Sequence, residues 1–118
     1  MAERPRRNPA IVWRLEKGMH ELAWDSARKG EEYEEIGVLT LMLGETIHQL
    51  NLVGAEIWTR INGINTAEKI AAEIAALFQA DPEEMHDDVA AFLTNMERKG
   101  WVTLTAGHGP RAPRWTAR

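Results

Sequence analysis

The sequence predicts an α+β domain in which a three-stranded antiparallel sheet is followed by three helices. This prediction depends on a change of period near the middle of the chain. Short apolar stretches up to Leu50 are typical of strands, whereas apolar residues after Asn51 recur at helical intervals. Three apolar helix stripes are enough to cover one face of a small sheet. The length of 118 residues fits one domain.

The first part of the chain contains two weak strand candidates. Ile11–Leu15 is a short apolar stretch that ends before Lys17-Gly18, a turn signal. Met19–Trp24 alternates only in part between apolar and polar residues, and we expect a strand-like segment there. The charged stretch Asp25–Glu35 is expected to be a loop.

A hairpin is the clearest strand feature. Ile36–Leu43 is an apolar run with β-branched residues, and Thr46–Leu50 follows it after Gly44-Glu45. Glycine in the first position of a two-residue connection is typical of a tight hairpin turn. A short final strand is also possible at Trp101–Leu104, near the end of the chain.

Local signals predict three helices between Asn51 and Gly100. Asn51 and Thr66 are good N-cap residues, and Asn62-Gly63 is a stop signal for the first helix. Asp81-Pro82 places an acceptor at the N-cap and proline at the first helical position of the third helix. The apolar stripes of the three helices are Leu52, Ala55, Trp58 and Ile61; Ile70, Ile74, Leu77 and Phe78; and Met85, Val89, Phe92, Leu93 and Met96.

Charge is distributed unevenly along the chain. The formal net charge is −4, but residues 8–104 hold eight basic and seventeen acidic residues, a net charge of −9. We therefore expect flexible basic tails at 1–10 and 105–118 and a folded domain at 11–104. The tails either aid solubility or contact an acidic partner. The acidic body repels nucleic acid at long range.

Several kinds of chemistry are missing from the sequence. Cysteine is absent, which excludes disulfides, thiolate metal sites and cysteine nucleophiles. No phosphate-binding loop, dinucleotide fingerprint or serine-hydrolase motif occurs. The histidines show no metal-ligand spacing, which leaves only a site assembled from distant residues; they are His20, His48, His86 and His108. We expect no enzymatic activity, no cofactor and no metal.

No apolar run approaches the roughly 20 residues that a membrane helix needs. The N-terminal sequence lacks the apolar core of a secretion signal. The sequence therefore predicts a soluble, cytoplasmic protein without a membrane partner.

Four carboxylates cluster at the start of the third predicted helix: Glu83, Glu84, Asp87 and Asp88. Acids in a first turn complement the helix dipole, and as an alternative they meet a basic segment of a partner. The second and third helices are also spaced like a helix–turn–helix in a winged-helix transcription regulator, which is the alternative function. Acids at the start of the recognition helix oppose contact with phosphates, so we expect no nucleic-acid partner.

The second hairpin strand is the candidate binding element. If Thr46–Leu50 lies at the margin of the sheet, its free backbone groups are able to pair with an incoming extended chain. Apolar residues of the third helix would add selectivity, although the same spacing also suits a plain core. A third alternative is a structural or dimerisation domain whose hairpin edge pairs with a second copy. The candidate peptide-binding residues are Thr46, Ile47, His48, Gln49, Leu50, Met85, Val89, Phe92, Leu93 and Met96.

An ordered series of short motifs resembles the PqqD family over residues 12–104. The motifs are Trp13-Arg14, Leu22–Asp25, His48–Asn51, Gly54–Trp58, Ile64–Ile70, Asp81–Glu84, Asp87–Val89, Phe92-Leu93 and Lys99–Val102. The resemblance lies in the order of these pieces, because no single piece is specific. Two features depart from the family pattern, a long acidic stretch at Ser26–Glu35 and an arginine-rich C-terminal tail.

The resemblance implies a winged-helix-like fold and a role as a peptide chaperone. The leader segment of a ribosomally made precursor would dock as an extra strand between the third strand, Thr46–Asn51, and the third helix. Ile47 and Gln49 would face this ligand. The partner would be a radical SAM maturase of the SPASM type, whose iron–sulfur clusters need thiolates that this chain lacks. The protein itself would be a monomer or homodimer, and its departures from the pattern favour a related system over the pyrroloquinoline quinone pathway.

Overall fold

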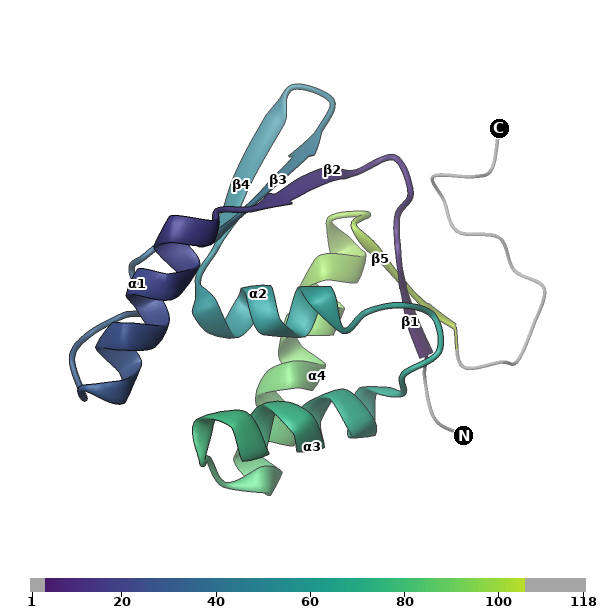
Figure 1. The fold of residues 1–118 in the computed structure, drawn as a ribbon. Coiled ribbons are helices and arrows are strands. Elements are labelled where there is room, and N and C mark those ends of the chain that lie inside the picture. Colours follow the sequence, from purple (N-terminus) through teal and green to yellow (C-terminus); the bar gives the residue numbers. More distant parts are fainter. Residues whose placement is uncertain (1–3, 106–118) are drawn as a thin grey trace, which may run out of the picture. The chain divides into compact units, whose positions relative to one another are not determined.

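Residues 4–105 of the chain are described by the structure, a computed structural model (Figure 1). These residues form four helices and five strands, which confirms the α+β class. The strands make two antiparallel sheets, one ordered β2-β3-β4 and the other β1-β5. The described chain divides into two units, residues 9–58 in one and residues 4–8 with 59–105 in the other.

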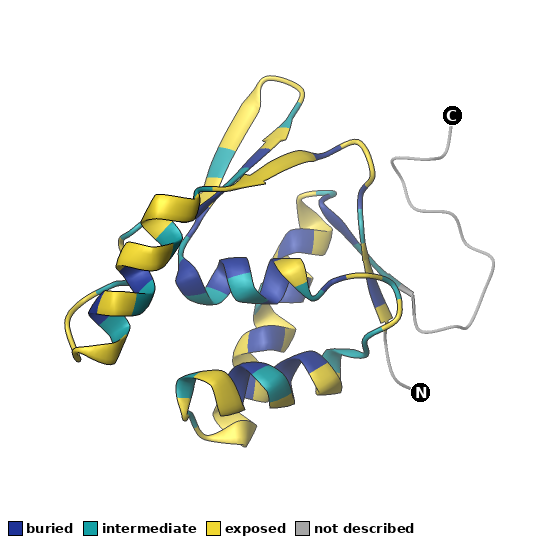
Figure 2. Ribbon diagram, viewed as in Figure 1, coloured by how far each residue is buried: buried dark blue, intermediate teal, exposed yellow. Residues whose placement is uncertain are grey.

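The unit of residues 9–58 holds the three-stranded sheet and two helices. Its elements are β2 (Val12–Leu15), α1 (Lys17–Arg28), β3 (Leu39–Leu43), β4 (Thr46–Leu50) and α2 (Leu52–Thr59). Thr59, the last residue of α2, already belongs to the other unit. Its largest fully buried side chains are Val38, Leu39, Leu41, Leu52, Ile57 and Trp58. Burial follows the elements: α2 is mostly buried, whereas β2 and most of β4 are exposed (Figure 2).

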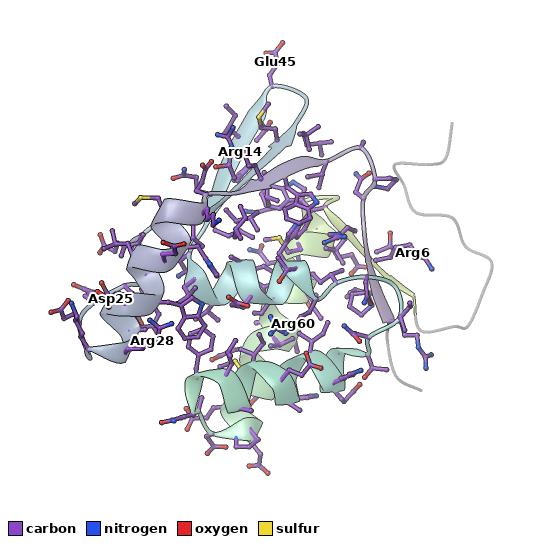
Figure 3. The ribbon with its side chains drawn as sticks, in the orientation of Figure 1. Arg6, Arg14, Asp25, Arg28, Glu45 and Arg60 are labelled. Atoms are coloured by element: carbon purple, nitrogen blue, oxygen red, sulfur yellow. The ribbon has the colours of Figure 1, made fainter. Side chains whose placement is uncertain are left out.

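The predicted hairpin is confirmed. β3 pairs with β4 in antiparallel register from Leu39↔Leu50 to Leu43↔Thr46, so that two residues form the turn. Gly44 has a φ of 62°, which an L side chain adopts only with strain. This is the geometry of a tight turn that has glycine first. Glu45, the second turn residue, lies at the tip of the hairpin and points away from the strands (Figure 3).

The prediction of a strand at Met19–Trp24 is wrong, because these residues lie in α1. The loop predicted for Asp25–Glu35 begins later than expected, after α1 ends at Arg28. The described residues therefore contain four helices and not three. Side-chain hydrogen bonds connect α1 to α2. His20 Nε2 lies 2.9 Å from Glu56 Oε2, and Trp24 Nε1 donates to the same oxygen at 3.2 Å. A helix brings residues four apart to one face, which the partial alternation did not reveal.

The caps of the three predicted helices are in place. Asn51 Oδ1 accepts from the Gly54 amide at 3.0 Å at the start of α2. Thr66 Oγ1 accepts from the Lys69 amide at 3.1 Å, and α3 follows as Ala67–Phe78. Asp81 Oδ1 accepts from the Glu83 amide at 2.9 Å before α4, which runs over Pro82–Arg98. These ends were predictable because each cap is made by residues close in sequence.

A second correction concerns the basic N-terminal segment. Arg4–Arg7, expected to be part of a flexible tail, form β1, which pairs antiparallel with β5 (Val102–Thr105). The Gly63 amide also donates to the Pro5 carbonyl at 2.9 Å. The unit of residues 4–8 and 59–105 therefore joins both ends of the described chain. The expected C-terminal tail, beyond residue 105, lies outside the described residues.

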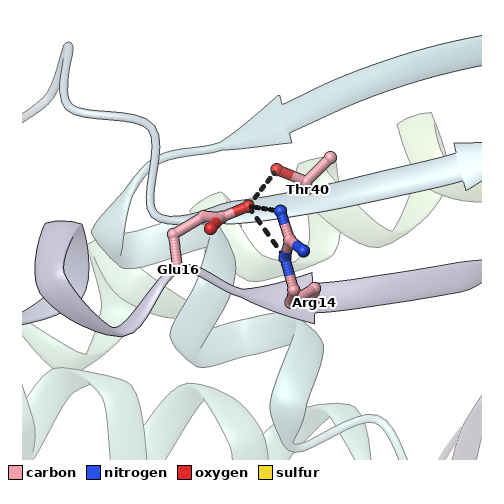
Figure 4. Close-up of polar contacts among 3 residues, drawn as sticks. All are labelled: Arg14, Glu16 and Thr40. Atoms are coloured by element: carbon pink, nitrogen blue, oxygen red, sulfur yellow. Dashed lines mark hydrogen bonds and ion pairs between the residues drawn. The ribbon is translucent and has the colours of Figure 1, made fainter.

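A carboxylate network joins the end of β2 to β3. Glu16 Oε2 accepts from Thr40 Oγ1 at 3.0 Å and from Arg14 Nη2 at 3.1 Å (Figure 4). Glu16 is the N-cap residue of α1 but makes no side-chain cap bond. The hydrogen bond from Thr40, and then those from Arg14, lower the pKa of Glu16 below its ordinary value.

We expect the Glu16→Gln variant to lose stability at neutral pH but not in acid. A carboxylate whose pKa is lowered by folding adds stability above its unfolded pKa, and that stability is lost as the pH falls through the lowered folded pKa. The free energy of unfolding, measured by urea titration from neutral pH to about pH 3, should therefore converge for the two proteins as the pH falls. A difference that stays constant with pH would contradict this assignment.

Candidate functional site

β4 is an edge strand of the three-stranded sheet. Within residues 4–105 it pairs with β3 on one side, and no strand pairs with its other side. The other edge, β2, carries the charged residue Arg14, as edge strands commonly do. β4 contains neither lysine nor proline, the residues that most often protect an edge from pairing.

The turn determines which backbone groups of β4 point outward. Leu43 and Thr46 close a two-residue turn, so Thr46, His48 and Leu50 direct their backbone groups toward β3. In agreement, the Leu50 carbonyl accepts from the Val38 amide at 2.8 Å. The alternation of an antiparallel ladder then directs the N–H and C=O groups of Ile47 and Gln49 away from β3.

An exposed apolar row crosses one face of this sheet and ends at β4. Val12 pairs with Met42, and Met42 pairs with Ile47. Their side chains are 66%, 42% and 64% exposed, respectively. Ile47 was predictable from the sequence as a candidate binding residue, but its two partners were not, because strand register determines which residues become neighbours. The signal that the sequence offered for Val12 was that it is apolar and lies in the predicted strand Ile11–Leu15.

The remaining β4 side chains have different surroundings. Thr46 and Gln49 are exposed, His48 is half-buried and Leu50 is buried. Gln49 lies against Gly37, where an added Cβ would be 2.6 Å from Gln49 Oε1. Glycine at position 37 thus leaves room for the amide side chain beside the edge.

The five candidate residues of α4 are mostly core residues. Met85, Val89, Leu93 and Met96 are buried, and Phe92 is half-buried. α4 contacts α3 and β5 of its own unit, which accounts for the buried stripe. β4 belongs to the other unit, and a role of the α4 residues in ligand binding stays a prediction.

The acidic cluster lies on the exposed surface of α4. Glu83, Glu84, Asp87 and Asp88 are all exposed, and the first two lie in the first turn of the helix. His86 Nε2 lies 4.0 Å from Glu68 Oε2 on α3. Among residues 4–105, no three His, Asp or Glu side chains are grouped as metal ligands would be. The same residues include no helix long and apolar enough to cross a membrane.

Comparisons with known proteins agree with this fold. The sequence model of the family described as "Coenzyme PQQ synthesis protein D (PqqD)" matches residues 38–102, more than half of the chain. The fold is similar to the solution NMR structure of the PqqD truncation of Methylobacterium extorquens PqqCD, described as a functional and stand-alone recognition element for ribosomally synthesized and post-translationally modified peptides. That match has a TM-score of 0.59 and 17% identity, and it covers 84% of this chain and 87% of that chain. No curated protein matches the chain.

Proposed function

The chain belongs to the PqqD family, and on this premise we propose that it binds the leader segment of a ribosomally made precursor peptide by β-strand addition. The observation that carries the proposal is the open edge of β4, where Ile47 and Gln49 direct their backbone groups away from β3. Main-chain hydrogen bonds to a guest strand would supply affinity there. The recognition role of the M. extorquens protein supports the same role here.

Side chains beside the edge would supply selectivity. Ile47 is exposed and continues into the apolar row with Met42 and Val12, so an apolar residue of the guest strand would pack against it. Gln49 and Thr46 offer polar groups on the same strand. Among the α4 candidates, Phe92 is the one whose side chain is only half-buried, and its part in peptide binding remains a proposal.

The chemistry of modification would belong to a separate enzyme. The family resemblance points to a radical SAM maturase of the SPASM type, which holds iron–sulfur clusters through cysteine thiolates. This chain contains no cysteine and so offers no thiolate to a cluster. The domain would act by holding the leader segment while the partner enzyme modifies the rest of the precursor.

A winged-helix role in DNA binding is less consistent with the charges. The start of α4, which would enter the major groove in a helix–turn–helix, presents Glu83, Glu84 and Asp87 to solvent. Carboxylates at that position repel phosphates, and basic contacts supply most of the affinity of DNA-binding proteins.

A titration of the ¹⁵N-labelled chain with leader peptides tests the proposal. The peptides are synthetic N-terminal segments of the short open reading frames that flank its gene, each tested in turn. We expect amide shifts at residues 46–50 because the guest strand would bond to this edge. Shifts confined to residues 12–15 would assign binding to β2, and a lack of shifts at high peptide concentration would remove the proposed function.

A further inference from the structure

The open edge of β4 is uncharged but has carboxylates at both ends. Thr46–Leu50 contains no charged residue, and Glu45 precedes it directly. At the other end, Leu50 is followed by Asn51, whose side chain contacts the acidic stretch at residues 31–35. This stretch, Glu31-Glu32-Tyr33-Glu34-Glu35, holds four exposed glutamates.

Hydrogen bonds hold the acidic stretch at the end of β4. Asn51 Nδ2 donates to the Glu34 carbonyl at 3.1 Å while Asn51 Oδ1 caps α2, so both ends of this amide are engaged. The Ile36 amide donates to the Tyr33 carbonyl at 3.1 Å, which forms a turn after the stretch. Val38 then joins Leu50 through the backbone, which fixes the chain between the stretch and the sheet.

None of these five carboxylates takes part in an ion pair within residues 4–105; they are Glu31, Glu32, Glu34, Glu35 and Glu45. Two exposed or partly exposed acids elsewhere in the unit are paired, Glu16 with Arg14 at 3.1 Å and Asp25 with Lys29 at 2.9 Å. The negative charge beside the edge is therefore available to a ligand.

We propose that the peptide strand added to β4 carries basic residues on both sides of an uncharged docking segment of about five residues, the length of the strand it pairs with. This inference rests on the proposed function and names the class of peptide. It holds for either direction of the guest strand, because carboxylates lie at both ends of β4. The exposed Ile47 side chain calls for an apolar residue within the docking segment.

The same charges oppose pairing of β4 with a second copy of the chain. In an antiparallel pair centred on His48, Glu45 of one copy would lie opposite Asn51 of its partner, beside the acidic stretch. Like charges so placed repel each other. The arrangement therefore favours a basic peptide over self-association at this edge.

Peptide display with the full chain as bait tests the inference. The library carries five random central residues, flanked on each side by two positions that are either lysine or glutamate. We expect lysine flanks to be enriched severalfold. For a selected peptide, the Glu34→Lys/Glu45→Lys double variant should bind about twofold to thirtyfold more weakly, the range for two exposed ion pairs lost.

A matched control is the Glu21→Lys/Glu97→Lys variant, which changes the net charge equally at exposed positions outside the edge. It should keep both the affinity and the preference for lysine flanks. Equal weakening in both variants, or peptides that shift the amides of residues 46–50 without any flank preference, would overturn this inference and leave the proposed function standing. If no peptide shifts those amides, both fail. A wild-type dimer that protects the amides at 46–50 would assign the edge to a second copy and also overturn the inference.

Discussion

The Gln49→Pro variant should lose at least about tenfold in affinity for a leader peptide while keeping its fold. The Gln49 N–H points away from β3, so proline at this position removes a donor that only a guest strand would use. The ring also obstructs the approach of another backbone, which is how natural edge strands are protected. Isothermal titration calorimetry with a leader peptide measures the loss, and circular dichroism checks the fold.

Gln49→Ala is the matched control because it removes the same side chain but keeps the N–H. We expect its affinity to stay within about threefold of the wild type, since an exposed polar contact contributes little. If both variants weaken binding equally, the side chain and not the backbone carries recognition. If neither does, the β4 edge is not the site.

The Trp58→Ala variant should lose about 3–5 kcal/mol of unfolding free energy, the usual range for deletion of a buried tryptophan. Trp58 is 0% exposed, and its ring packs edge-to-face on Trp13 with the ring centroids 6.4 Å apart. Since small domains are stable by only about 5–15 kcal/mol, such a loss leaves the variant close to unfolding. Urea unfolding followed by circular dichroism gives the value.

Trp13→Ala is the control for this measurement. Trp13 is 36% exposed and shares the same ring contact, so both variants lose the aromatic pair, which contributes about 0.5–1.5 kcal/mol. The larger loss expected for Trp58→Ala therefore measures the burial of Trp58 itself. Equal losses in the two variants would show that the pair contact, and not burial, dominates.

β4 was predictable from the sequence as the candidate binding strand, but the residues around it were not. Its turn was predictable from Gly44, because a tight hairpin needs glycine at that position. The neighbours of Ile47 were not predictable, since Val12 lies 35 positions earlier and reaches the same row only through the register of two strand pairs. The hydrogen bond from Asn51 Nδ2 to the Glu34 carbonyl was not predictable either, because the two residues are 17 positions apart in the chain.

The errors in the fold have one cause. α1 was predicted as a strand followed by a loop because few of its residues are core residues, with only Ala23 and Ser26 buried, and because its anchor on α2 is Glu56, distant in the chain. β1 looked like a basic tail because Arg4–Arg7 has no strand pattern, and its partner β5 lies at the other end of the described chain. Both elements are stabilised by partners that are distant in sequence, so the residues around each element do not reveal its structure.

By itself, the sequence determined the features that are made by neighbouring residues. These are the hairpin turn, the capped starts of α2, α3 and α4, and the apolar stripe of α4. Only the tertiary structure decided that β4 is an edge, that α1 is a helix and that β1 pairs with β5. The reason is physical: caps and turns are satisfied by hydrogen bonds within a few residues, whereas strand pairing and side-chain anchoring depend on groups that meet only after the chain has folded.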